Sequence, residues 1–449
     1  MLARIALTFI LACCSIQPFL HPQEPPPITI RPRPSEEIIL AVADAQPATP
    51  DKAGELSEAL KTFNQVLWDD LSFSGFFTMA GRSFYPPQPI VHPDTDLNYD
   101  AWSTLPFKVS FLSAGTLNLT DGVLRTELSV YDMKQRQWSF GRRFVGDLDQ
   151  VRTIAHWWAD EIVYKLTAGA SRGIASTKIA YVSRKGNAKE ICIMDYDGKN
   201  QQAFTHNGSL NLFPNWAPDN SKLAFMSLRS GKWEINIYSY IDGSRLAFPL
   251  FNTFASTPAI SPDGTEVVFS MRTPRGDTDL FISKLDGSGR RDITNNPAID
   301  TSPTWSPSGR QIAFTSNREG GVNQIYICDA DGSNVRKIVK EGGDADSPAW
   351  SPDGRYLAFH WKPRFGTNYD LFIVEVSSGI VHQLTSDSGS NESPSWAPDG
   401  RHLTFQSDRG GSSQIYIMLL DGSELHAITT QGNNTSPAWG GYFRRETEN

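Results

Sequence analysis

The chain has 449 residues, roughly two to four times the size of a common single domain, so more than one folded unit is expected. Hydrophobic residues make up 39% and charged residues 20%, a composition that is typical of globular proteins and excludes a disordered or fibrous chain. The 41 Lys and Arg residues against 49 Asp and Glu give a formal net charge of -8, which provides no global attraction to nucleic acid or anionic lipid. We therefore expect no nucleic-acid partner.

The first 35 residues divide by composition into two short segments. Residues 1–21 combine a single cation, Arg4, with a short apolar run and predict a secretory signal peptide. The apolar run is too short to span a bilayer, and no later stretch reaches the roughly 18 apolar residues that a spanning helix needs. Cys13 follows Ile10-Leu11-Ala12, which leaves a lipidated N-terminus as an alternative. The mature protein is expected to be soluble and exported.

Residues 22–35 are rich in proline, which prevents a helix and favours an extended, mobile segment. Such a segment is either a spacer or a strand-like peptide that another protein captures through backbone pairing. In the second case, the residues expected to contact the partner are Ile28, Thr29, Ile30 and Arg31.

Residues 36–170 mix helix and strand patterns and predict a small α/β domain. Leu56, Leu60, Phe63 and Leu67 share one face of a helix that follows a buried strand over 38–42. Short strands are expected over 75–77, 107–111, 116–119, 123–131 and 137–145, of which the last four form an antiparallel meander, and a helix over 151–166 closes the domain. We find no glycine-rich phosphate loop and no metal-ligand spacing in this region, so no cofactor is expected.

The C-terminal region repeats one phrase, Pro-x-Trp-Ser-Pro-Asp-Gly or a variant of it. The first prolines are Pro214, Pro258, Pro303, Pro348, Pro394 and Pro437, so the period is close to 45 residues. In a chain with strand patterns this period indicates propeller blades, each with four strands and tight turns at Pro-Asp-Gly and Asp-Gly. Residues 171–449 are therefore predicted to form a six-bladed β-propeller.

The repeats are out of phase at their two ends. The array begins with a second strand at Lys178 and ends just after a first strand at Trp439. The last strand must then pair with the first three to complete the sixth blade, which closes the ring and removes exposed sheet edges.

One mouth of the predicted channel carries residues that differ from blade to blade, as a unique partner requires. The candidate partner-binding residues are Phe213, Ser256, Thr257, Asp300, Thr301, Ser302, Asp346, Ser347, Asn391, Glu392, Ser393, Asn434 and Thr435. The acidic members are expected to meet a basic partner or a cation. An arginine also follows the second strand of each blade, for example Arg318 and Arg409, and is expected to bond to neighbouring acids or to form a basic outer ring.

Two motifs resemble catalytic or metal-binding patterns. Asp195 and Asp197 match the start of a calcium loop whose later ligands are missing, so we interpret them as turn residues. Ser171 lies in a Gly-x-Ser-x-Gly pattern, but a helix precedes it and a strand follows, the reverse of a nucleophile elbow. His156, Cys192 and Cys328 are interpreted as packing residues. No catalytic residue is therefore predicted.

Together, the signal, the mobile segment, the α/β domain and the repeats resemble the TolB family of the Tol-Pal system. The most specific matches are Thr177–Ser183, Met194–Gly198 and the terminal Ser436–Trp439. The resemblance implies a monomeric, non-enzymatic periplasmic scaffold for outer-membrane integrity and envelope constriction at division. Its propeller would bind the Pal lipoprotein, its N-terminal segment would bind TolA, and other outer-membrane proteins are left open as partners. The alternatives are a propeller related to peptidase caps and a propeller that binds glycans or small ligands.

Overall fold

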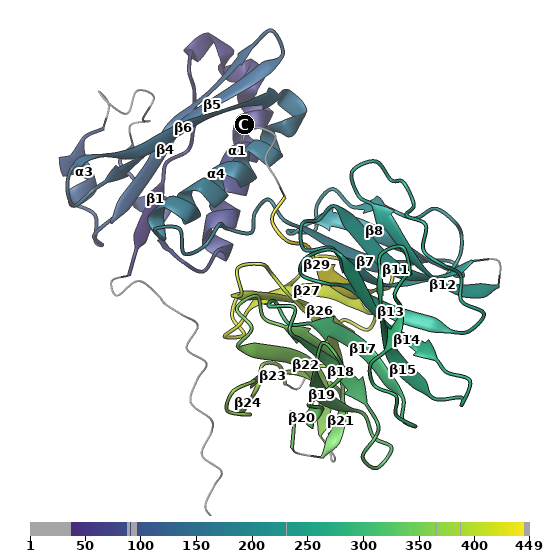
Figure 1. The fold of residues 1–449 in the computed structure, drawn as a ribbon. Helices are drawn as coiled ribbons and strands as arrows, with labels where there is room; N and C mark the ends of the chain where they lie inside the picture. Colours follow the sequence, from purple (N-terminus) through teal and green to yellow (C-terminus); the bar gives the residue numbers. More distant parts are fainter. Residues whose placement is uncertain are drawn as a thin grey trace, which may run out of the picture.

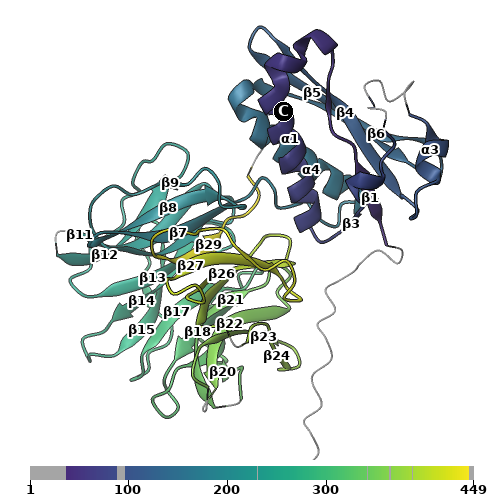
Figure 2. The same ribbon diagram turned by 180° about the vertical axis from the view of Figure 1, so that it is seen from behind.

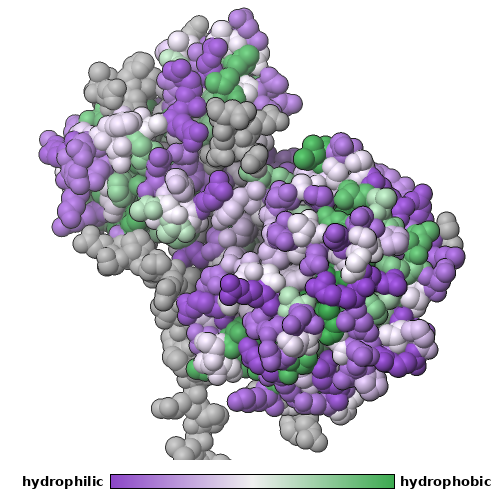
Figure 3. Space-filling model, in the orientation of Figure 1, coloured by the Kyte–Doolittle hydropathy of each residue, from purple (hydrophilic) through white to green (hydrophobic). Residues whose placement is uncertain are grey.

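The computed structural model describes residues 37–87, 90, 97–229, 231–340, 342–363, 366–386 and 388–443. The predicted signal peptide and all of the N-terminal segment, including Ile28, Thr29, Ile30 and Arg31, lie outside these residues. Figures 1 and 2 show two domains, an α/β domain followed by a β-propeller. In Figure 3 they form two lobes whose visible face is mainly hydrophilic, with smaller hydrophobic areas between. Within the described residues, no helix is long and apolar enough to cross a membrane.

The α/β domain is built on one mixed sheet. Its strand order is β3-β1-β4-β5-β6, with β2 also paired to β4. The strands are β1 (Ile39–Val42), β2 (Gln46–Pro47), β3 (Thr78–Met79), β4 (Phe111–Thr120), β5 (Val123–Asp132) and β6 (Gln137–Asp147). The helices are α1 (Ala53–Phe73), α3 (Tyr99–Ser103) and α4 (Val151–Leu166), with short 3-10 turns at Pro50–Lys52, Arg82–Phe84 and Leu148–Gln150.

The two long helices cover one face of this sheet (Figure 2). Three of the four predicted helix residues, Leu56, Phe63 and Leu67, are at most 1% exposed, and Leu60 packs at the edge of the same core. Trp158 of α4 is fully buried, and its indole N–H donates to Thr126 Oγ1 of β5 at 2.9 Å. The helical periodicity therefore identified the core correctly. The opposite face carries a second, smaller core that includes Trp102 of α3.

Three details of this domain differ from the sequence prediction. The strand expected over 107–111 is wrong, because β4 begins only at Phe111; it then runs without a break through the expected 116–119, and at Gly115 it passes very close to the backbone of β5. The short strand expected over 75–77 lies at Thr78–Met79. Strand β1 pairs in parallel with both β3 and β4, a long-range pairing that the local pattern does not indicate.

The propeller has six blades, as predicted, numbered here from the blade that closes the ring. Blade 1 contains β29 (Asn434–Trp439), β7 (Lys178–Lys185), β8 (Ala188–Asp195) and β9 (Gln202–Ala203). Blade 2 contains β10 (Asn211–Trp216), β11 (Lys222–Arg229) and β12 (Lys232–Ser239). Blade 3 contains β13 (Ala255–Ile260), β14 (Glu266–Arg272), β15 (Thr278–Lys284) and β16 (Arg291–Asp292).

The other three blades follow the same order. Blade 4 contains β17 (Asp300–Trp305), β18 (Gln311–Ser316), β19 (Gln324–Asp329) and β20 (Arg336–Lys337). Blade 5 contains β21 (Gly343–Trp350), β22 (Tyr356–Pro363), β23 (Asp370–Glu375) and β24 (Val381–Gln383). Blade 6 contains β25 (Asn391–Trp396), β26 (His402–Ser407), β27 (Gln414–Leu419) and β28 (His426–Ala427). Blade 2 lacks the predicted regular fourth strand and has in its place an isolated bridge between Tyr238 and Arg245.

The ring closes as the phase of the repeats predicts. Strand β29 pairs antiparallel with β7, with Trp439 opposite Ile179 and Asn434 opposite Ser183. Figure 1 shows this C-terminal strand in yellow beside the first propeller strands in teal. The Trp439 indole N–H donates to Thr177 Oγ1 at 2.8 Å, which ties the end of the chain to the entry of the propeller. Each blade therefore has a neighbour on both sides.

Among the described residues, the contacts of the α/β domain with the propeller lie at one end, the end with the Pro-Asp-Gly and Asp-Gly turns. We call this the turn end. His402 Nε2 donates to the Phe73 carbonyl at 2.9 Å, and the Arg401 guanidinium donates to the Gly75 carbonyl at 2.8 Å. Tyr196 of blade 1 also reaches α1, so the contacts come from blades 1 and 6. The other end of the channel faces away from the α/β domain.

Candidate functional site

The first strands of all six blades surround the central channel. A cavity of about 280 Å³ lies between them, lined mainly by the residues of the Pro-x-Trp phrase and those just before it. Because each first strand is innermost, its free edge faces this channel, which explains why a proline is tolerated there. We call the end of the channel opposite the turn end the open mouth.

A strained residue occurs at the same place in each first strand, directly before the proline. The φ angles of Phe213, Thr257, Ser302, Ser347, Ser393 and Ser436 lie between 48° and 55°. Each residue also sits at a break in the pairing register between the first and second strands. Left-handed backbone at a residue other than glycine costs of order 1 kcal/mol, and such strain is concentrated at functional sites. The open mouth is therefore a candidate site on backbone geometry as well as on sequence.

Nine of the 13 predicted mouth residues are at least partly exposed. Phe213 is the most accessible, with 41% of its surface exposed. The half-buried members are Thr257, Thr301, Ser302, Asp346, Ser347, Glu392, Ser393 and Thr435. The sequence thus placed these residues on one surface, although their role in binding stays a prediction.

The other four predicted mouth residues are buried, and here the sequence interpretation needs correction. Ser256, Asp300, Asn391 and Asn434 are at most 5% exposed. Asp300 forms an ion pair of 3.0 Å with Arg318, and Asn391 Oδ1 accepts from Arg409 at 2.7 Å. All four residues lie in the first two positions of a first strand. Asp300 and Asn391 bond there to the arginine that follows the second strand, whereas Asn434 Nδ2 donates to Gln414 Oε1 at 2.9 Å. Each of the two arginines therefore ties the loop after the second strand to the first strand of its own blade, and neither belongs to an outer ring.

The half-buried acids of the open mouth, Asp346 and Glu392, lie on blades 5 and 6. Asp346 Oδ1 accepts from Thr315 Oγ1 at 2.8 Å and from the backbone N–H of Ser347 at 2.5 Å. Burial raises the pKa of Glu392, and the nearby charges of Asp408 and Asp346 raise it further, although a hydrogen bond from Gln406 opposes the shift. The mouth therefore has an acidic side, which distinguishes blades 5 and 6 from the others.

Two polar residues next to these acids were missed by the sequence analysis. His360 lies opposite Asp346 in the strand register, and Gln406 lies opposite Glu392. His360 Nδ1 accepts from the backbone N–H of Ser393 at 3.3 Å, so this ring nitrogen carries no proton. Burial lowers the pKa of His360 against the raising effect of two nearby aspartates, which agrees with a neutral ring. Both residues could have been identified from the sequence by pairing the first strand of each blade with its second strand.

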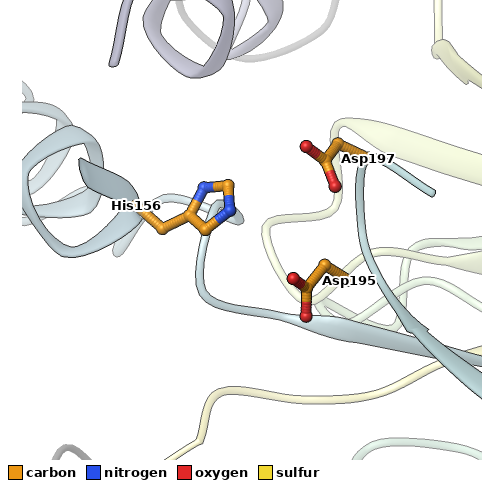
Figure 4. A group of neighbouring side chains, drawn as sticks. All are labelled: His156, Asp195 and Asp197. Atoms are coloured by element: carbon orange, nitrogen blue, oxygen red, sulfur yellow. The ribbon is translucent and has the colours of Figure 1, made fainter. Parts of the chain in front are cut away.

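A second cluster lies between the two domains, where the ligand atoms of His156, Asp195 and Asp197 come within 4.8 Å of one another (Figure 4). Three such groups can in principle bind a metal ion. Here, however, the Lys178 ammonium contacts Asp195 at 2.6 Å, and the Arg152 guanidinium bonds to Asp197. These cations already neutralise the carboxylates. The cluster is therefore an ion-pair network, in agreement with the interpretation of the aspartates as turn residues.

His156 belongs to a buried group that joins the domains. Its Nδ1 contacts Asp70 Oδ2 of α1 at 2.7 Å, and the hydroxyl of Tyr196 donates to Asp70 Oδ1 at 2.6 Å. We call Asp70, His156 and Tyr196 the interdomain triad. All three side chains are at most 5% exposed. The structure thus gives His156 a structural role, as predicted, but through a charged contact instead of simple packing.

Ser171, the serine of the elbow-like motif, lies in the linker between α4 and β7. It is 5% exposed, and its Oγ accepts from the backbone N–H of Gly173 at 3.1 Å. The buried thiols of Cys192 and Cys328 have raised pKa values, mainly because of burial. This placement agrees with the interpretation of all three as structural residues.

Comparison with known proteins supports the family assignment. The family model described as "TolB beta propeller domain" matches residues 164–362 and 337–442. The "Tol-Pal system protein TolB" of Anaeromyxobacter dehalogenans (strain 2CP-C) is 33% identical over 308 residues, which cover 67% of each chain. The chain belongs to the TolB family. Membership implies a role in the Tol-Pal system.

The resemblance to TolB extends to the α/β domain. The crystal structure of TolB from Acinetobacter baumannii superposes with a TM-score of 0.77 at 25% identity, covering 91% of this chain and 98% of the other. The TolB protein of Anaeromyxobacter sp. (strain K) is also 33% identical over 308 residues, or 67% of each chain. The predicted two-domain fold, an α/β domain followed by a six-bladed propeller, is thus confirmed.

Proposed function

We propose that this TolB-family protein is a non-catalytic periplasmic scaffold. The open mouth of its propeller binds the Pal lipoprotein, and the N-terminal segment around Ile28 to Arg31 binds TolA. In this role it contributes to outer-membrane integrity and to envelope constriction at division. The observation that carries the proposal is the difference between the two ends of the propeller: the α/β domain contacts the turn end, while the open mouth stays accessible.

The chemistry of the open mouth supports a protein partner. Phe213 offers an exposed aromatic ring of the kind that anchors protein interfaces. On blades 5 and 6, Asp346 and Glu392 suit a basic segment of Pal. Charges at such a rim control encounter rate and partner choice more than the lifetime of the complex. We therefore expect Glu392 to control the rate of association with Pal and Phe213 to control the rate of dissociation.

Binding of the purified periplasmic domain of Pal to the full chain tests the first contact. We expect Glu392→Lys to slow association by roughly tenfold at low salt, with a smaller effect at high salt because ions screen the charge. Phe213→Ala should mainly accelerate dissociation. The matched control is Asp286→Lys, which makes the same charge reversal at an exposed Asp-Gly turn of blade 3. Equal binding of Pal by Glu392→Lys, Phe213→Ala and the control would show that Pal does not bind at the open mouth.

The N-terminal contact is tested separately. Deletion of residues 22–34 leaves β1, which begins at Ile39, intact. We expect this variant to lose binding to the periplasmic region of TolA and to keep binding to Pal. A control in which residues 22–27 alone are deleted retains Ile28 to Arg31 and should bind TolA normally. Normal TolA binding by the longer deletion would contradict the assignment of this segment.

A further inference from the structure

A cavity in the α/β domain is used neither by the propeller nor by the interdomain contacts. Its volume is about 710 Å³, which lies within the range of roughly 300–1,000 Å³ typical of small-molecule sites. It lies on the side of the sheet opposite α1 and α4, between the start of β1, the start of β4, α3 and the turn after β5. The apolar side chains of its wall are Ile38, Ile39, Trp102, Val109, Phe111 and Met133.

The floor of the cavity is held by paired backbone groups. The Ser110 N–H donates to the Ile39 carbonyl at 2.8 Å, and the Ile39 N–H donates to Ser110 Oγ at 3.1 Å. The Met133 N–H donates to the Ser110 carbonyl at 3.0 Å. Trp102, which is 4% exposed, and Val109, which is 8% exposed, belong to the small core beneath. The wall is therefore formed before any ligand binds, which reduces the ordering cost of binding.

The rim of the cavity carries two cations and two anions with different surroundings. Lys108 and Lys134 are exposed, and among the described residues neither has a hydrogen-bond or ion-pair partner. The carboxylates already have partners: Glu37 accepts from Thr78 Oγ1, and Asp132 accepts from the backbone N–H of Gln135 at 2.8 Å. The groups free to bind a ligand at the rim are thus positively charged.

We propose that this cavity binds a long-chain carboxylate such as a fatty acid. Its alkyl chain lies against Ile39, Trp102 and Met133, and its carboxylate lies between the Lys108 and Lys134 ammonium groups. Apolar burial supplies most of the affinity, since affinity rises with each buried methylene group. The two exposed lysines select an anionic head over a neutral one. This site is separate from the open mouth, so the proposal does not depend on whether the protein binds Pal or TolA.

Titration of the full chain with the fluorescent fatty acid cis-parinaric acid tests the proposal. We expect saturable binding of one probe per chain, and competition by dodecanoate that is stronger than competition by methyl dodecanoate. Ser103→Trp places an indole at the cavity wall and should weaken binding more than tenfold. Its matched control is Thr104→Trp, a substitution at the next exposed residue, which does not line the cavity.

The charge of the rim is tested by a double substitution. Lys108→Gln with Lys134→Gln should weaken probe binding by roughly tenfold, because two exposed charge contacts are lost. The control, Lys61→Gln with Lys185→Gln, removes the same charge from exposed positions elsewhere and should bind like the unmodified chain. Absence of saturable binding, or equal binding by Ser103→Trp and Thr104→Trp, would overturn the site. Unchanged affinity of the Lys108/Lys134 variant would contradict the proposal that the ligand is an anion.

Discussion

The substitution Asp70→Asn tests whether the interdomain triad holds the two domains together. Asp70 is 5% exposed and lies between the imidazole of His156 and the hydroxyl of Tyr196, at 2.7 and 2.6 Å. Asparagine has nearly the same shape but no charge. The variant therefore removes the ionic part of the contact while it keeps an oxygen that accepts from Tyr196.

The size and pH dependence of the effect follow from His156. Burial alone would lower the pKa of His156, but the charge and hydrogen bond of Asp70 and the charge of Asp197 outweigh burial and the opposing charge of Arg152, so the pKa is raised. The protonated ring is thus favoured in the folded protein. Its contribution to stability is fully present below the unfolded pKa of about 6.5 and is lost as the pH rises through the folded pKa. Loss of one partner of a buried ion pair costs about 3–5 kcal/mol, whereas a neutral hydrogen bond contributes about 1 kcal/mol.

We therefore expect Asp70→Asn to lower the free energy of unfolding by about 3 kcal/mol at pH 6 and by a smaller amount at pH 9. Urea unfolding followed by near-ultraviolet circular dichroism measures the change, and limited proteolysis of the 167–177 linker reports separation of the domains. The matched control is Asp69→Asn, an exposed neighbour on α1 whose carboxylate contacts only Gln65 among the described residues. Equal effects of the two variants, or an effect of Asp70→Asn that does not change with pH, would refute the reasoning.

Three further predictions concern the frame that supports both sites. Arg318→Met should cost about 3–5 kcal/mol in thermal or urea unfolding because it leaves the buried Asp300 carboxylate unpaired, and adding Asp300→Asn should recover most of the loss; no recovery would contradict this. Trp439→Ala should cost about 3–5 kcal/mol, far more than Trp233→Ala on blade 2, and similar melting temperatures of the two would refute this. Gly115→Val should yield little folded protein, because a Cβ there would lie 2.1 Å from the Glu127 carbonyl oxygen; a normal melting curve would disprove the close approach.

The fold of the propeller could be predicted from the sequence because each blade carries the same short sequence pattern. Each copy of the Pro-x-Trp phrase marks one first strand, and the phase difference between Lys178 and Trp439 indicates how the ring closes. The same repetition placed most of the candidate mouth residues on one surface. Blade 2 departs from the pattern, since an isolated bridge between Tyr238 and Arg245 stands where the other five blades form a fourth strand.

The parts that could not be predicted depend on contacts between distant residues. Asp70 and Tyr196 are 126 positions apart, and His402 bonds to a carbonyl 329 positions away. No periodicity connects such residues. Burial at the start of the first strands was missed for a related reason: whether Asp300 faces solvent or Arg318 depends on the path of a loop, which strand alternation does not fix. The parallel pairing of β1 with β4 is long-range in the same sense.

Closure of the ring and attachment of the α/β domain depend on the same blades. Trp439 of the closing strand bonds to Thr177 in the linker, and its ring belongs to the same hydrophobic core as Leu67 of α1 and Trp158 of α4. The closing strand β29 thus packs both against the first strands of its neighbouring blades and into the core that covers α1 and α4. Blades 2 to 5 have no member in this core, so a partner bound only there would touch no blade of the core. On the acidic side of the mouth, Glu392 lies on blade 6, next to the closing strand, whereas Asp346 lies on blade 5, which has no member in this core.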